Sequence, residues 1–116
     1  MQQLDIPIIH KTYELYRTLH EIKKSIPKME RYTLWQRSKN ATLDILQGLL
    51  KVGYLQQERR PEQLIQVSAN VDMLRVFLRL TLDVKAINQK KYITIQQALD
   101  EIGRMLGGWM KSLKQK

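Results

Sequence analysis

The chain has 116 residues, which is room for one domain with one core, and we expect that domain to span residues 1–116. It carries 20 Lys and Arg against 11 Asp and Glu, a net charge of +9 that favours polyanionic partners. The absence of cysteine excludes disulfides and thiol chemistry. No apolar run approaches the ~20 residues that span a bilayer, and the N-terminal residues lack a secretory pattern. We therefore expect a cytoplasmic protein that does not use a membrane.

The first two predicted elements are amphipathic helices. The first runs from about Ile8 to Ser25 and is ended by Pro27. The second runs from about Thr33 to Gln56 and contains Gly48 and Gly53. Glycine lowers helix propensity, so these two positions indicate either close contact with a neighbour or local weakness.

The third predicted helix runs from about Glu62 to Ile87 and is apolar on two faces. One stripe consists of Leu64, Val67, Val71, Leu74, Leu78 and Leu82. The second stripe consists of Val76, Phe77, Leu80, Val84 and Ile87. Such wide apolar coverage indicates burial on more than one side. Apolar surface that remains after a bundle closes is usually buried by oligomerisation.

The fourth predicted helix follows a connection from Asn88 to Ile93, and Thr94 is its expected cap, with Gln97 completing a capping box. Its apolar seam is Ile95, Leu99, Ile102, Leu106, Trp109 and Leu113. The same helix carries Gly103, Gly107 and Gly108, although each glycine costs a helix ~1 kcal/mol against alanine. Packing within the chain and a subunit or partner interface both explain these glycines. Our candidate interface residues here are Gly107, Gly108 and Trp109.

Four helices with short connections, and no segment with strand periodicity, predict an all-α fold. The arrangement expected is an up-down-up-down four-helix bundle. The two-faced third helix and the glycine-bearing fourth helix further predict that the bundle assembles into a homo-oligomer.

Catalysis is not expected from this sequence. His10 and His20 are the only histidines, and neither belongs to a zinc or di-iron motif. The adjacent acids Asp100 and Glu101 point about 100° apart on a helix, so they cannot act as a carboxylate pair. We therefore expect no catalytic residue, no cofactor and no metal site.

Basic residues gather at the two ends of the predicted bundle. The first and third connections of an up-down bundle lie at the same end, and our candidate nucleic-acid-binding residues there are Lys23, Lys24, Lys28, Arg31, Lys90 and Lys91. The opposite end gathers Arg59, Arg60, Lys111, Lys114 and Lys116. Tyr32, Trp35 and Tyr92 lie near the first end, where they can stack on unpaired bases or form the rim of the core.

Two arginines, Arg75 and Arg79, share one face of the third predicted helix. One interpretation is a ladder of pairs within the helix, with Asp72 and Asp83 as partners, worth a few tenths of a kcal/mol per pair. The other is a bridge across a subunit interface or a phosphate contact. We favour the interface, because arginine suits partly buried pairing.

Two segments together resemble a known family. They read Val-Asp-Met-Leu-Arg-Val-Phe-Leu-Arg-Leu over residues 71–80 and Leu-Asp-Glu-Ile-Gly-Arg-Met-Leu-Gly-Gly-Trp-Met over residues 99–110. With them the chain resembles the accessory variability determinants of diversity-generating retroelements. These belong to a broader four-helix-bundle family that includes proteins encoded in ribosomal RNA intervening sequences. The resemblance is strongest over residues 71–113.

The resemblance implies an accessory subunit without catalytic activity, whose five copies form a barrel-like ring. It also implies binding to the retroelement reverse transcriptase and to template RNA, in support of mutagenic copying. The expected partners are thus a reverse transcriptase, RNA and DNA with little sequence preference, and further copies in a pentamer. The alternative is a protein–protein scaffold without a nucleic-acid role. Only the first function predicts a steep loss of nucleic-acid affinity with salt.

Overall fold

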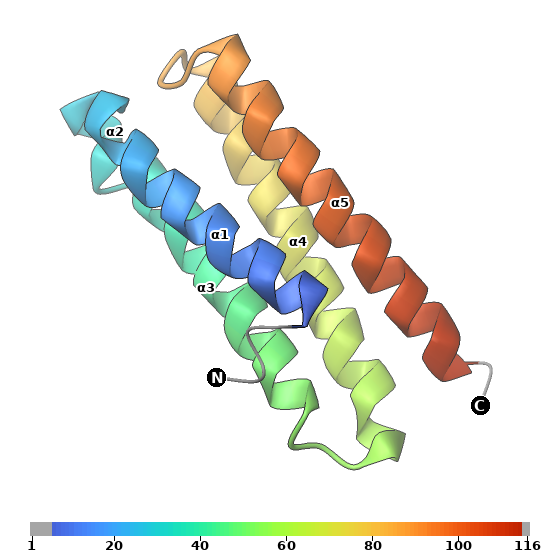
Figure 1. The fold of residues 1–116 in the computed structure, drawn as a ribbon. Coiled ribbons are helices and arrows are strands. Elements are labelled where there is room, and N and C mark those ends of the chain that lie inside the picture. The colour runs from blue at the N-terminus through green and yellow to red at the C-terminus, as the bar shows by residue number, and fades with distance from the viewer. Residues whose placement is uncertain (1–5, 115–116) are drawn as a thin grey trace.

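The computed structural model describes residues 6–114, in which four long helices and one short helix follow one another along the chain (Figure 1). They are α1 (Pro7–Ile22), α2 (Lys28–Arg31), α3 (Leu34–Val52), α4 (Arg60–Asp83) and α5 (Gln89–Lys114). Two 3-10 turns, η2 (Lys23–Ser25) and η3 (Gln57–Arg59), lie in the connections. No strand occurs within residues 6–114. None of the helices in this range is both long enough and apolar enough to cross a membrane.

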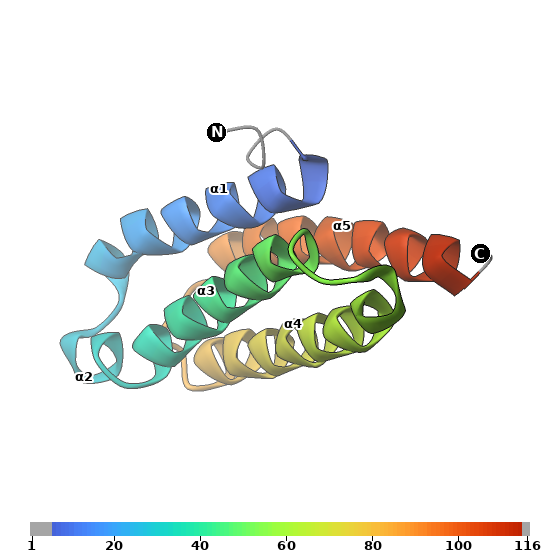
Figure 2. The same cartoon turned by 90° about the horizontal axis from the view of Figure 1, so that it is seen from below.

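The four long helices form an elongated bundle, seen from below in Figure 2. α1 packs against α3 and α5, and α4 packs against the same two helices. Each helix runs antiparallel to the one that follows it, apart from the short α2 (Figure 1). The predicted all-α up-down-up-down four-helix bundle is confirmed.

The core is built from the inward stripes of all four long helices. On α5 the first four seam residues, Ile95, Leu99, Ile102 and Leu106, are buried, whereas Trp109 is half-buried against the edge of the core. Trp35 of α3 is fully buried, and its indole N–H donates to the carbonyl oxygen of Leu19 on α1 at 3.1 Å. That hydrogen bond satisfies the single polar group of a large apolar side chain.

The connection between α4 and α5 differs from the prediction, because α4 ends at Asp83 rather than at Ile87. Lys85 lies in the left-handed region with φ of 62°. The backbone N–H groups of Lys85 and Ala86 donate to the carbonyl oxygens of Leu82 and Thr81, both at 2.9 Å. This pair of bonds is a Schellman motif, which ends a helix by satisfying its last carbonyls. The motif usually has glycine where this chain has Lys85.

The predicted cap of the last helix is also wrong. α5 begins at Gln89, and the side-chain Oδ1 of Asn88 accepts the backbone N–H of Lys91 at 2.8 Å. Asn88 is therefore the N-cap, a position that asparagine favours. Thr94 lies inside the helix, where its hydroxyl donates to the carbonyl oxygen of Lys90.

The glycines of the bundle have two kinds of surroundings. A methyl group added at Gly48 would lie 2.7 Å from Cγ2 of Val67, and one added at Gly103 would lie 2.9 Å from Nη2 of Arg75. At Gly107 and Gly108 an added methyl group would meet nothing within 4 Å. Close contact with Val67 thus explains Gly48, whereas the Arg75 guanidinium beside Gly103 ends a flexible side chain that can move aside. Gly107 and Gly108 face open space within residues 6–114.

Candidate nucleic-acid interface

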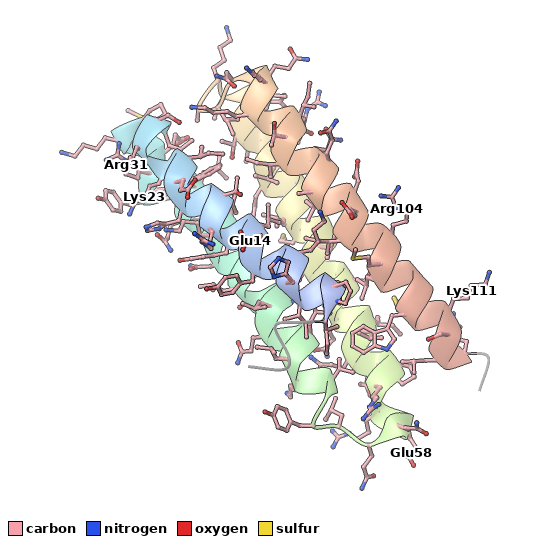
Figure 3. All side chains as sticks on the ribbon, in the orientation of Figure 1. Glu14, Lys23, Arg31, Glu58, Arg104 and Lys111 are labelled. Atoms are coloured by element: carbon pink, nitrogen blue, oxygen red, sulfur yellow. The ribbon has the colours of Figure 1, made fainter. Side chains whose placement is uncertain are left out.

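One hydrogen bond joins two segments that are 66 residues apart in the sequence. The Lys91 ammonium donates to the hydroxyl oxygen of Ser25 at 2.9 Å, so η2 and the start of α5 meet. The first and third connections therefore lie at the same end of the bundle, as predicted. We call six of its basic residues the α2 pole: Lys23, Lys24, Lys28, Arg31, Lys90 and Lys91. Figure 3 labels Lys23 and Arg31 at this end, and Glu58 and Lys111 at the other.

Three cations of the α2 pole also organise the surrounding chain. Arg31 donates from Nη2 to the carbonyl oxygens of Lys24 and Ile26, at 3.4 and 3.2 Å. The Lys23 ammonium lies 5.1 Å from the centroid of the Tyr32 ring, a cation–π contact. Lys91 holds Ser25, as described above. These contacts fix the shape of the segment that joins α1 to α3.

The positive charge of the α2 pole is not neutralised by pairing. None of the four ion pairs within residues 6–114 includes a basic residue of the pole. Lys24, Lys28 and Lys90 are exposed, and none of them uses its ammonium in a hydrogen bond among the described residues. Exposed and unpaired cations are the groups that bind phosphates without regard to sequence.

The three aromatic residues predicted near this end are not equally accessible. Trp35 is 0% exposed, so it cannot stack on a base, and its interpretation as a core residue is confirmed. Tyr92 is half-buried. Tyr32 is 62% exposed and is the one of the three that offers an accessible ring.

The opposite end is cationic as well, as predicted. Arg59, Lys111 and Lys114 are exposed, and Arg60 donates from Nε to the carbonyl oxygen of Leu55 at 3.0 Å. Lys116 lies outside the described residues. The chain therefore offers two separate basic surfaces, one at each end of the bundle.

The two arginines of α4 form different pairs. Arg79 donates to the Asp83 carboxylate at 3.1 Å, one turn along the same helix, and this hydrogen bond raises the pKa of Arg79. Arg75 pairs with Asp100 of α5, and not with Asp72 as in the ladder described above. Within one chain, Arg75 thus bridges α4 to α5. Its role in a subunit interface, like that of Arg79, stays a prediction.

Two adjacent acids of α5 serve two different helices. Asp100 pairs with Arg75 of α4, while Glu101 pairs with Lys11 of α1 at 2.9 Å. Their divergence on the helix, expected from the sequence, is confirmed. Within the part of the chain that the structure describes, no cluster of three or more histidine or acidic side chains could hold a metal ion.

The outer face of α4 is apolar and uncovered. Met73, Val76, Leu80 and Val84 recur every three or four residues, and they are between 45% and 61% exposed. Val76, Leu80 and Val84 belong to the second stripe predicted for the two-faced helix, to which the structure adds Met73. Phe77, expected in the same stripe, is instead half-buried against the core. Ile87, expected in the same stripe, is instead buried beyond the end of α4. An exposed apolar stripe of this length marks an interaction surface.

One buried cation was not predicted from the sequence. Lys39 of α3 is only 4% exposed, and its ammonium donates to Nδ1 of His20 at 2.9 Å and lies 5.3 Å from the centroid of the Tyr16 ring. Lys39 is four residues after the buried Trp35 and three before the buried Thr42. That helical spacing placed Lys39 on the inward face and could have revealed it.

Comparison with known proteins gives one family match. A family model described as bAvd-like matches residues 7–113, which is nearly the whole of the described bundle. None of the curated proteins compared with the chain matches it.

Proposed function

Because the chain belongs to the bAvd-like family, the accessory variability determinants of diversity-generating retroelements, we propose that it binds the retroelement reverse transcriptase and its template nucleic acid. In this role residues 1–116 act as one non-catalytic domain in the cytoplasm. The protein supports mutagenic reverse transcription by bringing enzyme and template together. RNA and DNA are bound with little dependence on sequence.

The observation that carries this proposal is the unpaired charge of the α2 pole. The pole joins cations from two connections at one end of the bundle, and no ion pair within residues 6–114 neutralises them. A single copy offers a few phosphate contacts. Several copies in one assembly add their contacts through avidity, so weak single sites can bind one strand tightly.

Self-assembly is the second part of the proposal, and the exposed apolar stripe of α4 supports it. We expect a homo-oligomeric ring, and the resemblance described above implies five copies. Its interface would use the stripe together with Arg75, Arg79, Gly107, Gly108 and Trp109. The open space beside Gly107 and Gly108 leaves room for a neighbouring copy to approach α5 closely.

The nucleic-acid part is tested by removing charge at one end only. The triple variant Lys24→Gln, Lys28→Gln, Lys90→Gln removes three exposed cations of the α2 pole. Their ammonium groups form no hydrogen bond or ion pair within residues 6–114, so the substitutions should leave the fold intact. Each lost phosphate contact reduces the steepness of log affinity against log salt by about 0.7 for single strands. Loss of all three contacts should therefore reduce that steepness by about 2 per copy. The matched control is Arg59→Gln, Lys111→Gln, Lys114→Gln at the opposite end. Circular dichroism and light scattering check that helicity and assembly size are unchanged.

The outcomes separate the functions. If only the control variant weakens RNA binding, the opposite end is the nucleic-acid surface. If the parent protein binds neither RNA nor DNA at physiological salt, the charge serves an acidic protein partner, and the scaffold is the better function. Co-purification with the reverse transcriptase in the absence of RNA tests the remaining part of the proposal.

A further inference from the structure

A hollow opens beside the α2 pole, between the start of α3 and Phe77 of α4. Its volume is about 650 Å³, and it is a shallow hollow that lies widely open to solvent. It is lined by Tyr32, Thr33, Leu34, Gln36, Arg37, Asn40 and Phe77. The first six come from the segment that follows α2, and Phe77 comes from α4.

The walls of the hollow combine aromatic, amide and guanidinium groups. Tyr32 and Phe77 supply the rings, and Tyr32 is 62% exposed although a ring of this size is usually better buried. Gln36 donates from its amide to the amide oxygen of Asn40 at 3.0 Å, so these two side chains form an ordered polar pair. Arg37 is exposed and forms no ion pair within residues 6–114.

The hollow is continuous with the positive charge of the pole through Tyr32. The Tyr32 ring lines the hollow, and the Lys23 ammonium lies 5.1 Å from the centroid of the same ring. A ligand in the hollow can therefore contact an aromatic ring and lie close to positive charge at the same time. A second copy that presented its own α2 pole to this hollow would be disfavoured by like-charge repulsion.

We propose that this hollow receives one unpaired nucleobase of a single-stranded nucleic acid, an inference that rests on the nucleic-acid binding proposed above. The base stacks on Tyr32, its polar edge meets the amides of Gln36 and Asn40, and the neighbouring phosphate pairs with Arg37 or Lys23. Stacking tolerates every base because each has a flat π-face. The site thus selects unpaired strands over duplexes without reading sequence.

The test compares two probes, a single-stranded oligothymidylate and the same strand with abasic sites throughout. The parent protein is expected to bind the intact strand at least about fivefold more tightly, the lower limit for one base–aromatic stack. Tyr32→Ala should remove this preference and leave affinity for the abasic strand unchanged. Tyr32→Phe should retain it. The matched control is Tyr54→Ala, a tyrosine that is 79% exposed and lies in the connection between α3 and α4.

A second measurement uses the unaltered chain, so it does not depend on how any variant folds. A strand carrying 5-iodouracil is photo-cross-linked to the protein, and the adduct is mapped by mass spectrometry. We expect the adduct on Tyr32 or Phe77. An adduct found only elsewhere would overturn the base site.

The remaining outcomes distinguish this inference from the proposed function. If no oligonucleotide binds, both fail. If intact and abasic strands bind equally with the same salt slope, the cationic pole binds phosphates but the hollow holds no base. If Tyr32→Ala changes the assembly size, the hollow is an interface between copies. If polyglutamate binds with a dependence on Tyr32 while bases make no difference, its occupant is an acidic protein segment.

Discussion

Gly48 of α3 packs directly against the Val67 side chain of α4, and replacing it with alanine should destabilise the bundle. The added methyl carbon would lie 2.7 Å from Cγ2 of Val67, where ordinary contact begins at 3.4 Å. Val67 is 1% exposed, and a β-branched side chain in a helix has one strongly preferred rotamer, so it cannot turn away easily. The helices themselves must therefore shift.

The magnitude follows from two opposing effects. Overfilling a packed core lowers the free energy of unfolding by ~1–3 kcal/mol. Replacing glycine by alanine inside a helix raises the same free energy by ~1 kcal/mol, because alanine has the higher helix propensity. The net expectation for Gly48→Ala is a loss of about 1 kcal/mol. Val67→Ala alone should lower the free energy of unfolding by about 2 kcal/mol. In that background Cγ2 of Val67 is gone, so a methyl group at position 48 no longer meets it. Gly48→Ala should there be stabilising.

The change of sign is the quantity to measure. Urea unfolding followed by circular dichroism gives the four free energies of the double-mutant cycle, at one protein concentration because the proposed assembly would contribute to stability. A stabilising effect of Gly48→Ala in the parent chain would refute the packing argument. Equal effects in both backgrounds would show that Val67 is not what restricts position 48.

Two further substitutions test the ends of α4 and α5. Lys85→Gly should raise the thermal midpoint, because a lysine held at positive φ carries ~1–2 kcal/mol of strain that glycine lacks. A midpoint that stays the same or falls would mean that the left-handed conformation is not strained here. Gly108→Ala should favour the isolated helix by ~1 kcal/mol but disrupt the proposed assembly, since its methyl group meets nothing within residues 6–114 and would meet the neighbouring copy proposed there. Sedimentation that shows an unchanged assembly would remove Gly108 from the interface.

The architecture could be predicted from the sequence because apolar periodicity and helix-ending residues agree along the chain. Leu99, Ile102 and Leu106 are buried as their spacing requires, and the two basic connections meet as the topology requires. The boundaries of α4 and α5 could not be predicted in the same way. A left-handed lysine carries no signature in sequence, and Asn88 and Thr94 are both residue types that cap helices.

The candidate site was less predictable than the fold, because it depends on contacts between helices. Arg75 has acids at two places within reach, and only packing decides that Asp100 is its partner. Helical spacing with the buried Ser38 and Thr42 places Trp35 on the inward face of α3. Tyr32 lies before that helix, so the same spacing does not predict its exposure. The hollow beside Tyr32 includes Phe77 of α4, which no local pattern connects with it.

The ion pairs of Asp100 and Glu101 reinforce the angular phase of α5 that its buried apolar seam sets. Exposed pairs of this kind add only ~0–1 kcal/mol each, so burial of Leu99, Ile102 and Leu106 contributes more to the orientation of the helix. Rotating α5 by one residue position, about 100°, would break both pairs at once, since one reaches α4 and the other α1. Gly107 and Gly108 follow on the same rigid helix, and their outward direction is thereby fixed. A single residue inserted between Glu101 and Gly107 would keep the helix but turn this glycine surface away from its present heading.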